Sequence, residues 1–413
     1  LLSNTELFNQ LKGEKYDVVI AELLGGCIHG YLHAIGGRVK IATSAVPLSN
    51  AAASYFGIPS FSSYVISGLA PSMSGSNMNF FERFVNFINE QIEYIRIKEQ
   101  NLYLEEPLLN KAFGPSFPSL REIIKNVSFL FVNSNEFMTH SRPISSKIIH
   151  IGGIVQPTLT NTIAEKHVKE ILDNSKSGAI LVSFGTSADA SKMSMEMRKG
   201  FVEAFKQFPA YDFIWKYEPS SQDQSDAELL ATAPNVHTVK WVEQRAILAH
   251  PKLKVFITHG GMNSINEATH AGKPMVVIPL FADQLYNAVL VKTKGIGEHV
   301  EIRSTTNPQF LIDALSKVLN DMSYFKNVQV LRRKLELTPF SSAEKLVKWV
   351  EFAAQFPGQL TELNLPNTEE LGWFVYYSLD VICASFALIL VAMLFVIVSF
   401  RCLLRVVRNI YLS

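Results

Sequence analysis

The sequence predicts an α/β protein with two doubly wound, parallel-sheet domains and one C-terminal transmembrane helix. Short apolar runs alternate with helical segments along most of the chain, and such runs are typical of parallel strands buried on both faces. Repeated strand–helix units imply a parallel sheet covered by helices. The chain has 413 residues, which is enough for two ordinary domains and further segments.

The first domain is expected to occupy residues 1–155. Its strands are predicted at residues 16–21, 127–132 and 147–154. Residues 79–99 have the period of a helix and carry four phenylalanines at Phe80, Phe81, Phe84 and Phe87. We expect this aromatic stripe to belong to the core, although a groove for an apolar ligand could share it.

Residues 156–162 contain a proline and lack an apolar period, so we place a linker there. The second domain is expected to occupy residues 163–341. Its strands are predicted at residues 179–184, 212–216, 235–240, 254–258 and 274–278, with a helix at 194–207. Residues 342–370 are predicted to form a closing amphipathic helix and a polar stalk.

Residues 381–400 form an uncharged apolar run that is long enough to cross a hydrocarbon core of about 30 Å. Arg401, Arg405 and Arg408 follow it without an acidic residue. The positive-inside rule therefore predicts a cytoplasmic tail at 401–413 and a luminal or extracellular body.

The first residues of the chain lack the leader that a luminal body needs for entry. Either a leader and more have been lost, or the chain is a tail-anchored cytosolic protein; we favour the first. A glycan on Asn126, in the sequon Asn126-Val127-Ser128, would exclude the second.

Composition excludes several classes of protein. Lys and Arg number 38 against 37 Asp and Glu, so no overall field would attract nucleic acid. Three cysteines, Cys27, Cys383 and Cys402, make neither a disulfide framework nor a zinc spacing. The motifs of zinc metalloproteases, serine hydrolases and P-loop enzymes are absent from the sequence.

The stretch from residue 241 to residue 284 is the most informative part of the sequence. The strand at 254–258 is followed by His259-Gly260-Gly261 and by a helix that opens at Asn263. Glycines at a strand end permit close backbone approach, and free N–H groups of a first helical turn attract an anion. Glu267 lies one helical turn after Asn263, so His259, Asn263 and Glu267 are expected to project toward one crevice. These three residues suit a nucleotide diphosphate, with donors at the phosphates and a carboxylate at the ribose diol.

A second loop, Ser183-Phe184-Gly185-Thr186, follows the strand at 179–184 and has the small residues that let backbone N–H groups approach phosphate. Taken one at a time, these residues have plain structural explanations. Asn263, Asp283 or Gln244 would cap a helix, and Trp241 would be core. Their joint spacing favours the binding site.

Residues 241–284 resemble the signature of the UDP-glycosyltransferase family, which includes the UDP-glucuronosyltransferases. The match consists of W-x-x-Q at Trp241 and Gln244, F-I-T-H-G-G at 256–261, Asn263, Glu267, and P-L-F-A-D-Q at 279–284. The resemblance implies a GT-B-like fold, in which two Rossmann-like domains face a cleft and the second binds the UDP-sugar.

The resemblance also implies roles for single residues. Trp241 would stack on uracil and Gln244 would contact the base. His259 and Asn263 would bind the diphosphate, and Glu267 would hold the ribose hydroxyls. The complete set assigned to UDP is Ser183, Gly185, Thr186, Trp241, Gln244, His259, Gly261, Asn263, Ser264 and Glu267. Asp283 and Gln284 are assigned to the sugar.

An inverting transfer needs a general base for the acceptor hydroxyl. In the family this base is a His near the N-terminus, and an Asp after the first strand of our prediction orients it. Glu22 stands at the position of that Asp. The His has no counterpart here, so we expect that the start of the first domain is missing.

The sequence is therefore interpreted as a UDP-glycosyltransferase that moves glucose or glucuronate to a small hydrophobic acceptor and gives a β-glycoside. Two alternatives remain, a membrane-anchored UDP-sugar-binding protein without catalysis and a transferase acting on lipid-linked or cell-surface glycans. No cofactor and no metal site are expected, since the UDP-sugar is a co-substrate and no DxD motif stands out. The resemblance implies a single-pass protein of the endoplasmic reticulum with luminal domains, and is compatible with a homo-oligomer.

Overall fold

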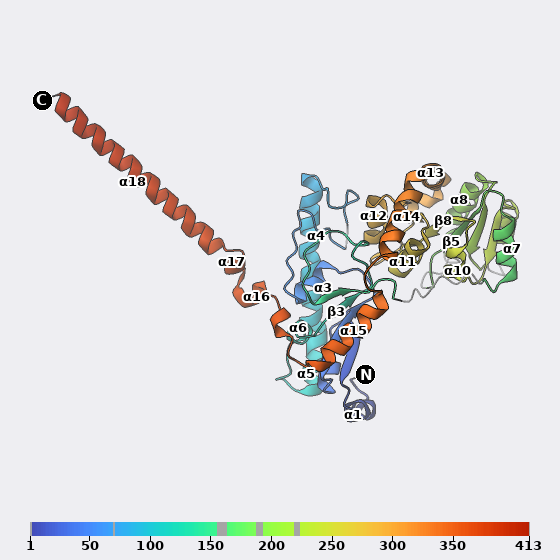
Figure 1. Ribbon diagram of the computed structural model, residues 1–413, viewed down its shortest axis with the longest axis horizontal. Coiled ribbons are helices and arrows are strands. Elements are labelled where there is room, and N and C mark those ends of the chain that lie inside the picture. Colours follow the sequence, from blue (N-terminus) through green and yellow to red (C-terminus); the bar gives the residue numbers. More distant parts are fainter. Residues whose placement is uncertain (1, 69–70, 155–162, 187–192, 219–223, 413) are drawn as a thin grey trace.

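The computed structural model describes residues 2–68, 71–154, 163–186, 193–218 and 224–412. Two parallel-sheet domains lie side by side, and a long C-terminal helix stands away from both (Figure 1). The predicted linker at 156–162 lies outside the described residues, so the domain boundaries stay predictions.

The N-terminal sheet has four parallel strands in the order β1-β2-β3-β4. They are β1 (Val18–Glu22), β2 (Val39–Ser44), β3 (Leu130–Val132) and β4 (Ile148–His150). Its helices are α1 (Thr5–Gly13), α2 (Cys27–Ala34), α3 (Asn50–Tyr55), α4 (Phe80–Glu99), α5 (Glu106–Phe113) and α6 (Leu120–Lys125). A π-helical turn (Gln100–Glu105) joins α4 to α5.

The C-terminal sheet has six parallel strands in the order β10-β9-β8-β5-β6-β7. They are β5 (Ala179–Ser183), β6 (Asp212–Lys216), β7 (Val236–Val239), β8 (Leu253–Thr258), β9 (Met275–Val277) and β10 (Gly297–His299). The helices of this domain are α7 (Lys166–Asn174), which precedes β5, and α8 (Met195–Lys206), α9 (Gln224–Ala231), α10 (Gln244–Ala249), α11 (Met262–Ala271), α12 (Gln284–Thr293), α13 (Pro308–Asn320) and α14 (Met322–Glu336). Every residue of β5 is buried, as expected of a central strand covered on both faces.

The predicted strands are confirmed as β1 and β3 to β9, with ends that differ by up to four residues. Strands β2 and β10 were not predicted. The parallel pairs β5–β8 and β8–β9 place the loops that follow β5 and β8 at one edge of the sheet. That edge carries the site described below.

The chain returns to the N-terminal domain after α14. Helix α15 (Ser342–Gln355) packs on the N-terminal sheet, where the ring of Trp349 lies 4.9 Å from that of Phe129. Lys345 donates from Nζ to Oε1 of Glu136 at 2.6 Å. Helix α15 lies where a closing helix was predicted, and its contacts join the segment after the second domain to the N-terminal domain.

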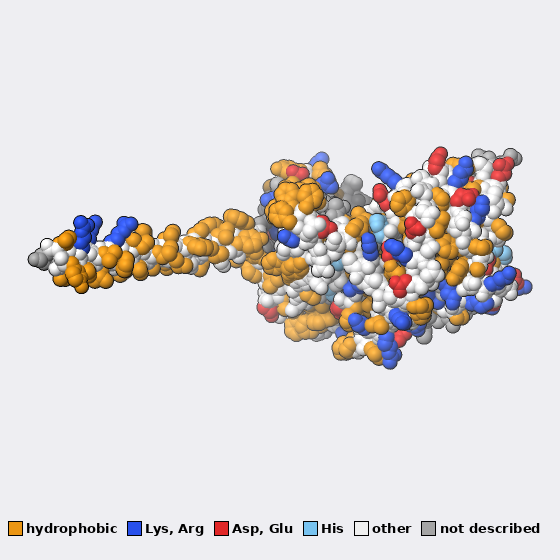
Figure 2. Space-filling view, turned by 90° about the horizontal axis from the view of Figure 1, so that it is seen from above, with side chains coloured by type: hydrophobic (Ala, Val, Ile, Leu, Met, Phe, Trp, Pro, Cys, Tyr) orange, Lys and Arg blue, Asp and Glu red, His pale blue; other side chains and the backbone are white. Residues whose placement is uncertain are grey.

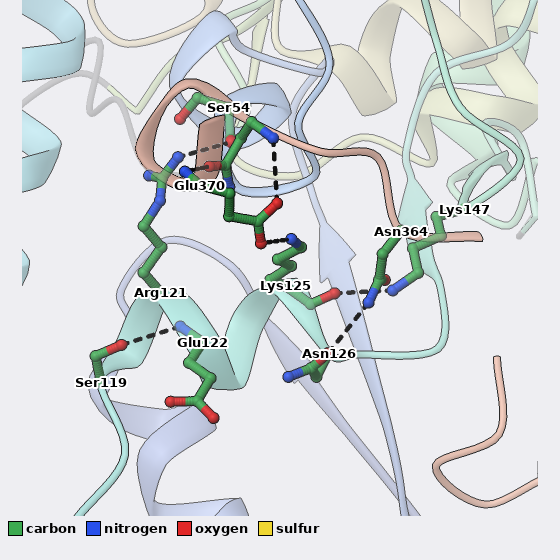
Figure 3. Close-up of polar contacts among 10 residues, drawn as sticks. Ser54, Ser119, Arg121, Glu122, Lys125, Asn126, Lys147, Asn364 and Glu370 are labelled. Carbon is green, nitrogen blue, oxygen red and sulfur yellow. Dashed lines mark hydrogen bonds and ion pairs between the residues drawn. The ribbon is translucent and has the colours of Figure 1, made fainter. Parts of the chain in front are cut away.

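The stalk after α15 lies against α6 (Figure 3). It contains the short helices η4 (Thr361–Leu363), α16 (Thr368–Leu371) and α17 (Trp373–Tyr376). Glu370 forms an ion pair with Lys125, and Asn364 donates from Nδ2 to Oδ1 of Asn126 at 3.2 Å. These contacts hold the root of the C-terminal helix beside the N-terminal domain.

Helix α18 (Leu379–Tyr411) is long and apolar enough to cross a membrane, and none of its side chains is buried against the rest of the protein. It extends the predicted run at 381–400 by a few residues at its start and through the Arg-containing segment at its end. The figure shows it leaving the N-terminal domain alone (Figure 1).

The expectation that the aromatic stripe of residues 79–99 is core is wrong. Phe80 and Phe81 at the start of α4 are 75% and 71% exposed. The helical period was correct, but the apolar side of α4 faces away from the protein.

Candidate active site

A cavity of about 360 Å³ opens between the two domains at the carboxyl edge of the C-terminal sheet. All ten residues predicted to bind UDP line it, and so does Asp283. The remaining lining residues are Ala45, Val46, Lys216, Val242 and Met262. Since Ala45 and Val46 follow β2, the cavity is built from both domains.

His259 lies in a narrow slot between two glycines. A Cβ atom on Gly185 would lie 2.9 Å from the Cε1 atom of His259, and one on Gly261 would lie 2.5 Å from its Nε2 atom. Gly185 has a φ of +80°, which favours glycine. The two glycines therefore leave room for the imidazole and let the backbone approach a ligand.

Burial lowers the pKa of His259 to about 4. The ring is therefore neutral at physiological pH in the ligand-free protein. A neutral imidazole still donates one hydrogen bond, and a nearby anion would raise its pKa by favouring the charged form. Both properties suit a group that faces phosphate.

Helix α11 directs its N-terminus into the cavity, because Gly261 at its N-cap and Met262, Asn263 and Ser264 of its first turn all line it. The first N–H groups of a helix have no partner within the helix and attract anions. Asn263 does not cap the helix. Its Oδ1 instead accepts from Nδ2 of Asn133 at 2.8 Å.

Gln244 and Glu267 meet on one wall of the cavity. Gln244 donates from Nε2 to Oε2 of Glu267 at 2.6 Å and to Oγ of Ser264 at 3.2 Å. Burial raises the pKa of Glu267, while the Gln244 contact and nearby Arg245 oppose that shift. Because Glu267 lines the cavity, its carboxylate can also accept from a ligand hydroxyl.

Trp241 is a wall residue and not core, since 60% of its surface is exposed. The Nζ atom of Lys216 lies 4.5 Å from the centre of the indole ring and donates to the carbonyl of Gly185 at 2.9 Å. A cation over one ring face fixes the indole by a cation–π contact. Lys216, the last residue of β6, was not predicted to belong to the site.

Asp283 and Gln284 lie differently although they are neighbours in sequence. Asp283 lines the cavity, accepts from Nδ2 of Asn287 at 2.7 Å and does not cap α12. Gln284 is 3% exposed, and its Oε1 accepts from the backbone N–H groups of Leu280 and Phe281. The structure does not bring Gln284 to the cavity wall, so its contact with the sugar stays a prediction.

Glu22 is the last residue of β1. It is joined by a hydrogen bond to Ala45, which lines the cavity. Its carboxylate accepts from the backbone N–H of Ala45 at 3.0 Å and from Oγ1 of Thr43 at 3.2 Å. His29 is buried nearby, and burial lowers its pKa to about 4. The carboxylate is thus held in place at the domain boundary.

Asn133 is a second residue that the sequence analysis missed. It donates from Nδ2 to the carbonyl of Ala45 at 3.0 Å and to Asn263, and its Oδ1 accepts from Nδ2 of Asn266 at 3.2 Å. The residue follows β3 directly, so its position at a strand end was the signal that could have found it. It connects the two domains beside the cavity, since Ala45 and Asn263 both line it.

Among the residues that the structure describes, no group of three or more His, Cys, Asp or Glu side chains is placed to hold a metal ion. The polar groups that line the cavity are the imidazole of His259, amide and hydroxyl groups, the N–H groups of the first turn of α11, the ammonium group of Lys216 and two carboxylates. This donor set fits an anionic ligand at one end and hydroxyl groups at the other.

Two facing parallel-sheet domains with a cavity at the carboxyl edge of the second define the fold of GT-B glycosyltransferases. A UDP-glucosyltransferase from Polygonum tinctorium, solved with 3,4-dichloroaniline, superposes with a TM-score of 0.58 over 85% of this chain and 79% of that one, at 15% identity. A UDP-glucose:anthocyanidin 3-O-glucosyltransferase solved with UDP gives 0.54 over 82% and 75% of the two chains, at 16% identity.

The family model described as UDP-glucoronosyl and UDP-glucosyl transferase matches residues 1–411. The chain belongs to this family of glycosyltransferases. UDP-glucuronosyltransferase 3A1 of Bos taurus is 31% identical over 387 residues, which are 92% of this chain and 70% of the relative. The chain spans between 64% and 72% of the length of four Caenorhabditis elegans relatives.

The lowered pKa of His259 predicts how binding depends on pH. UDP-glucose lacks a terminal phosphate monoester, the group that titrates at about pH 6. The charge of UDP-glucose itself therefore stays constant over the measured pH range. If its diphosphate raises the pKa of His259 above the free value of about 4, binding takes up a proton below the raised pKa. We expect the affinity for UDP-glucose, measured by calorimetry, to rise as the pH falls from 8 to 5.

A His259→Gln variant should show a flat profile over the same range. An equal rise in the variant would contradict the role of His259. The range ends at pH 5 because acid also destabilises the fold. His259 has a lower pKa when folded (about 4) than its ordinary 6.5, so the unfolded chain binds more protons between these values and the stability present above pH 6.5 is lost toward pH 4.

Proposed function

We propose that the protein transfers glucose or glucuronate from its UDP derivative to a hydroxyl of a small hydrophobic acceptor, with inversion, and releases UDP and a β-glycoside. The observation that carries this proposal is a cavity between the domains, which gathers the ten predicted UDP ligands and Asp283. A cavity that both domains line can hold a donor against an acceptor.

In this proposal, uracil stacks on the face of Trp241 opposite Lys216, with Gln244 at its edge. Glu267 accepts from the ribose hydroxyls. The diphosphate lies at the N-terminus of α11 beside His259, where N–H groups and imidazole stabilise negative charge. Asp283 accepts from sugar hydroxyls.

The transfer itself is a displacement at the anomeric carbon. The acceptor oxygen forms a bond to that carbon as the bond to the β-phosphate oxygen breaks, and a general base takes the hydroxyl proton. We place the base beside the carboxylate of Glu22, which is already held by Ala45 and Thr43. His259 and the helix N-terminus stabilise the charge on the leaving UDP.

The cavity favours glucose over glucuronate as the donor sugar. Of the lining residues that the structure describes, Lys216 is the one Lys or Arg, and it is engaged by Gly185 and Trp241. A carboxylated sugar at Asp283 would find no free cation among these residues and would face a second carboxylate.

The proposal is tested on the full-length protein with radiolabelled UDP-glucose and UDP-glucuronate and a phenol as acceptor. We expect UDP to bind, and the labelled glucose to move to the phenol as a β-glycoside. An Asp283→Asn variant should keep UDP binding and lose most of the transfer. If the protein binds UDP but transfers neither sugar, the enzymatic proposal fails and a binding protein without catalysis remains.

We further propose that the protein is anchored by α18 in the endoplasmic reticulum, with both domains in the lumen and residues 401–413 in the cytoplasm. The charge pattern around α18 supports this orientation, because Arg401, Arg405 and Arg408 follow the apolar run.

The sequon at Asn126 provides a topology prediction. Asn126 is exposed at the end of α6, and its amide nitrogen points away from Asn364 (Figure 3). We expect a glycan on Asn126 in cells, seen as a gel shift that endoglycosidase removes and that Asn126→Gln abolishes. Digestion of both domains by protease added outside sealed microsomes would contradict the luminal orientation.

A further inference from the structure

In helix α4 the polar side faces the protein and the apolar side faces solvent. The side that faces the protein carries Asn86 and Glu93, both buried. The opposite side carries large apolar residues that are exposed to solvent, namely Phe80, Phe81, Phe84, Ile88 and Ile95. A surface helix in water normally shows the opposite pattern.

Asn86 and Glu93 both have hydrogen-bond partners in the N-terminal domain, so the reversed orientation is built into the fold. Asn86 donates from Nδ2 to the carbonyls of Ser62 and Val65 and accepts from the N–H of Ser67 at 2.8 Å. Glu93 accepts from the N–H of Ala51 at 3.3 Å. These bonds fix the rotation of α4 about its axis, because turning the helix would leave buried polar groups without partners.

The exposed side of α4 lies next to the root of the membrane helix. A crevice of about 790 Å³ separates α4 from α17, and both Phe87 of α4 and the aromatic residues Trp373, Tyr376 and Tyr377 line it. Phe61, on the adjacent loop, lines it too. Trp and Tyr beside a membrane span are typical of the interface between headgroups and acyl chains.

The position of this root relative to α4 is fixed by the stalk. The ion pair of Lys125 with Glu370 and the bond between Asn126 and Asn364 hold the stalk on the N-terminal domain (Figure 3). In the ribbon view α4 runs along the side of this domain nearest α18 (Figure 1). Apolar side chains gather at the end of the globular part from which α18 leaves (Figure 2).

We propose that the exposed side of α4 lies in the surface of the membrane leaflet that α18 enters, with its phenylalanines among the acyl chains. An amphipathic helix of this kind lies in the plane of the interface with its apolar side in the lipid. Continuity with the anchor selects lipid as the occupant, because α18 keeps α4 within reach of the leaflet whenever the protein is in a membrane.

Seating α4 in the leaflet would hold the N-terminal domain against the membrane and leave the C-terminal domain in water. The contact has two attachment points, the spanning helix and the helix in the interface. An apolar compound dissolved in the leaflet would then be concentrated beside the N-terminal domain. This arrangement needs no residue of the cavity between the domains.

The experiment uses the full chain in phosphatidylcholine vesicles and a photo-crosslinking amino acid at one position at a time. Phe84→p-benzoylphenylalanine probes α4, and Phe310→p-benzoylphenylalanine is the matched control on α13. The two phenylalanines are 55% and 53% exposed, so the probes differ in place and not in accessibility. After irradiation, mass spectrometry measures the fraction of the labelled peptide that has gained one phospholipid.

We expect the phospholipid adduct at position 84 to exceed that at position 310 by about fivefold or more, as for a side chain within the acyl region. Equal adduct yields at the two positions would overturn the proposal. Adducts at position 84 that join two copies of the chain would also overturn it, because the occupant would then be a second protomer. UDP binding by both variants verifies the fold without entering the readout.

Discussion

Replacing Glu267 with glutamine is expected to weaken UDP binding by about 10- to 100-fold, or about 1.5–3 kcal/mol, the loss of hydrogen bonds to a charged group. The change keeps the shape of the side chain and its bond with Gln244 but removes the negative charge that the ribose hydroxyls would meet. Calorimetric titration of UDP into both proteins measures the effect. Glu228→Gln, which removes an exposed carboxylate outside the cavity, should leave the affinity unchanged.

A second ligand tests whether the affinity lost in Glu267→Gln is that of the ribose hydroxyls. UDP without its 2′ and 3′ hydroxyls should bind the native protein about as weakly as UDP binds the Glu267→Gln variant. The variant should then bind the two ligands with similar affinity. If the variant instead loses the same factor for both ligands, Glu267 acts on another part of the nucleotide or only supports Gln244.

The cavity that we propose as the nucleotide site was predictable as a cluster of residues because its residues follow buried strands. Strands β5 and β8 pair in register, with Ser183 opposite Thr258. The residues that come next, such as Gly185 and His259, therefore meet at one edge of the sheet. A parallel sheet thus brings positions that are distant in the sequence together in space. Once the strands are predicted, the residues that follow them are predicted to lie close to one another.

Residues that join the site from outside the motif were not predictable in this way. Lys216 ends β6 and Asn133 follows β3, but nothing in the sequence says which strand lies beside which. Their roles depend on the strand order and on how the domains face each other. Ala45 belongs to the same group, because β2 itself was missed.

The periodicity of a helix tells which side chains share a side and not what that side contacts. In α4 the phenylalanine stripe was correctly placed on one side, yet Asn86 and Glu93 face the protein and the stripe faces out. Gln284 is a related case. Its neighbour Asp283 lines the cavity, whereas the amide of Gln284 bonds the backbone of its own loop.

The second large effect is expected for Gly261→Ala, which adds one methyl group and should lower the UDP affinity as much as His259→Ala does. At Gly261, φ is −60° and ψ is 141°, so alanine fits the backbone. Its Cβ, however, would lie 2.5 Å from Nε2 of His259, and the ring must leave its slot. Loss of a donor to a charged phosphate costs about 1.5–3 kcal/mol, which is about 10- to 100-fold in Kd.

The double variant decides whether the methyl group acts through the ring. In a His259→Ala background there is no imidazole to displace, so adding Gly261→Ala should change the UDP affinity very little. This non-additivity is the coupling that a double-mutant cycle measures. If the two losses add, the methyl group blocks the phosphate directly and the ring stays in place. Gly13→Ala, where a Cβ meets nothing within 4 Å, is the control for the glycine replacement itself. The free energy of unfolding of each variant should change by no more than about 1 kcal/mol.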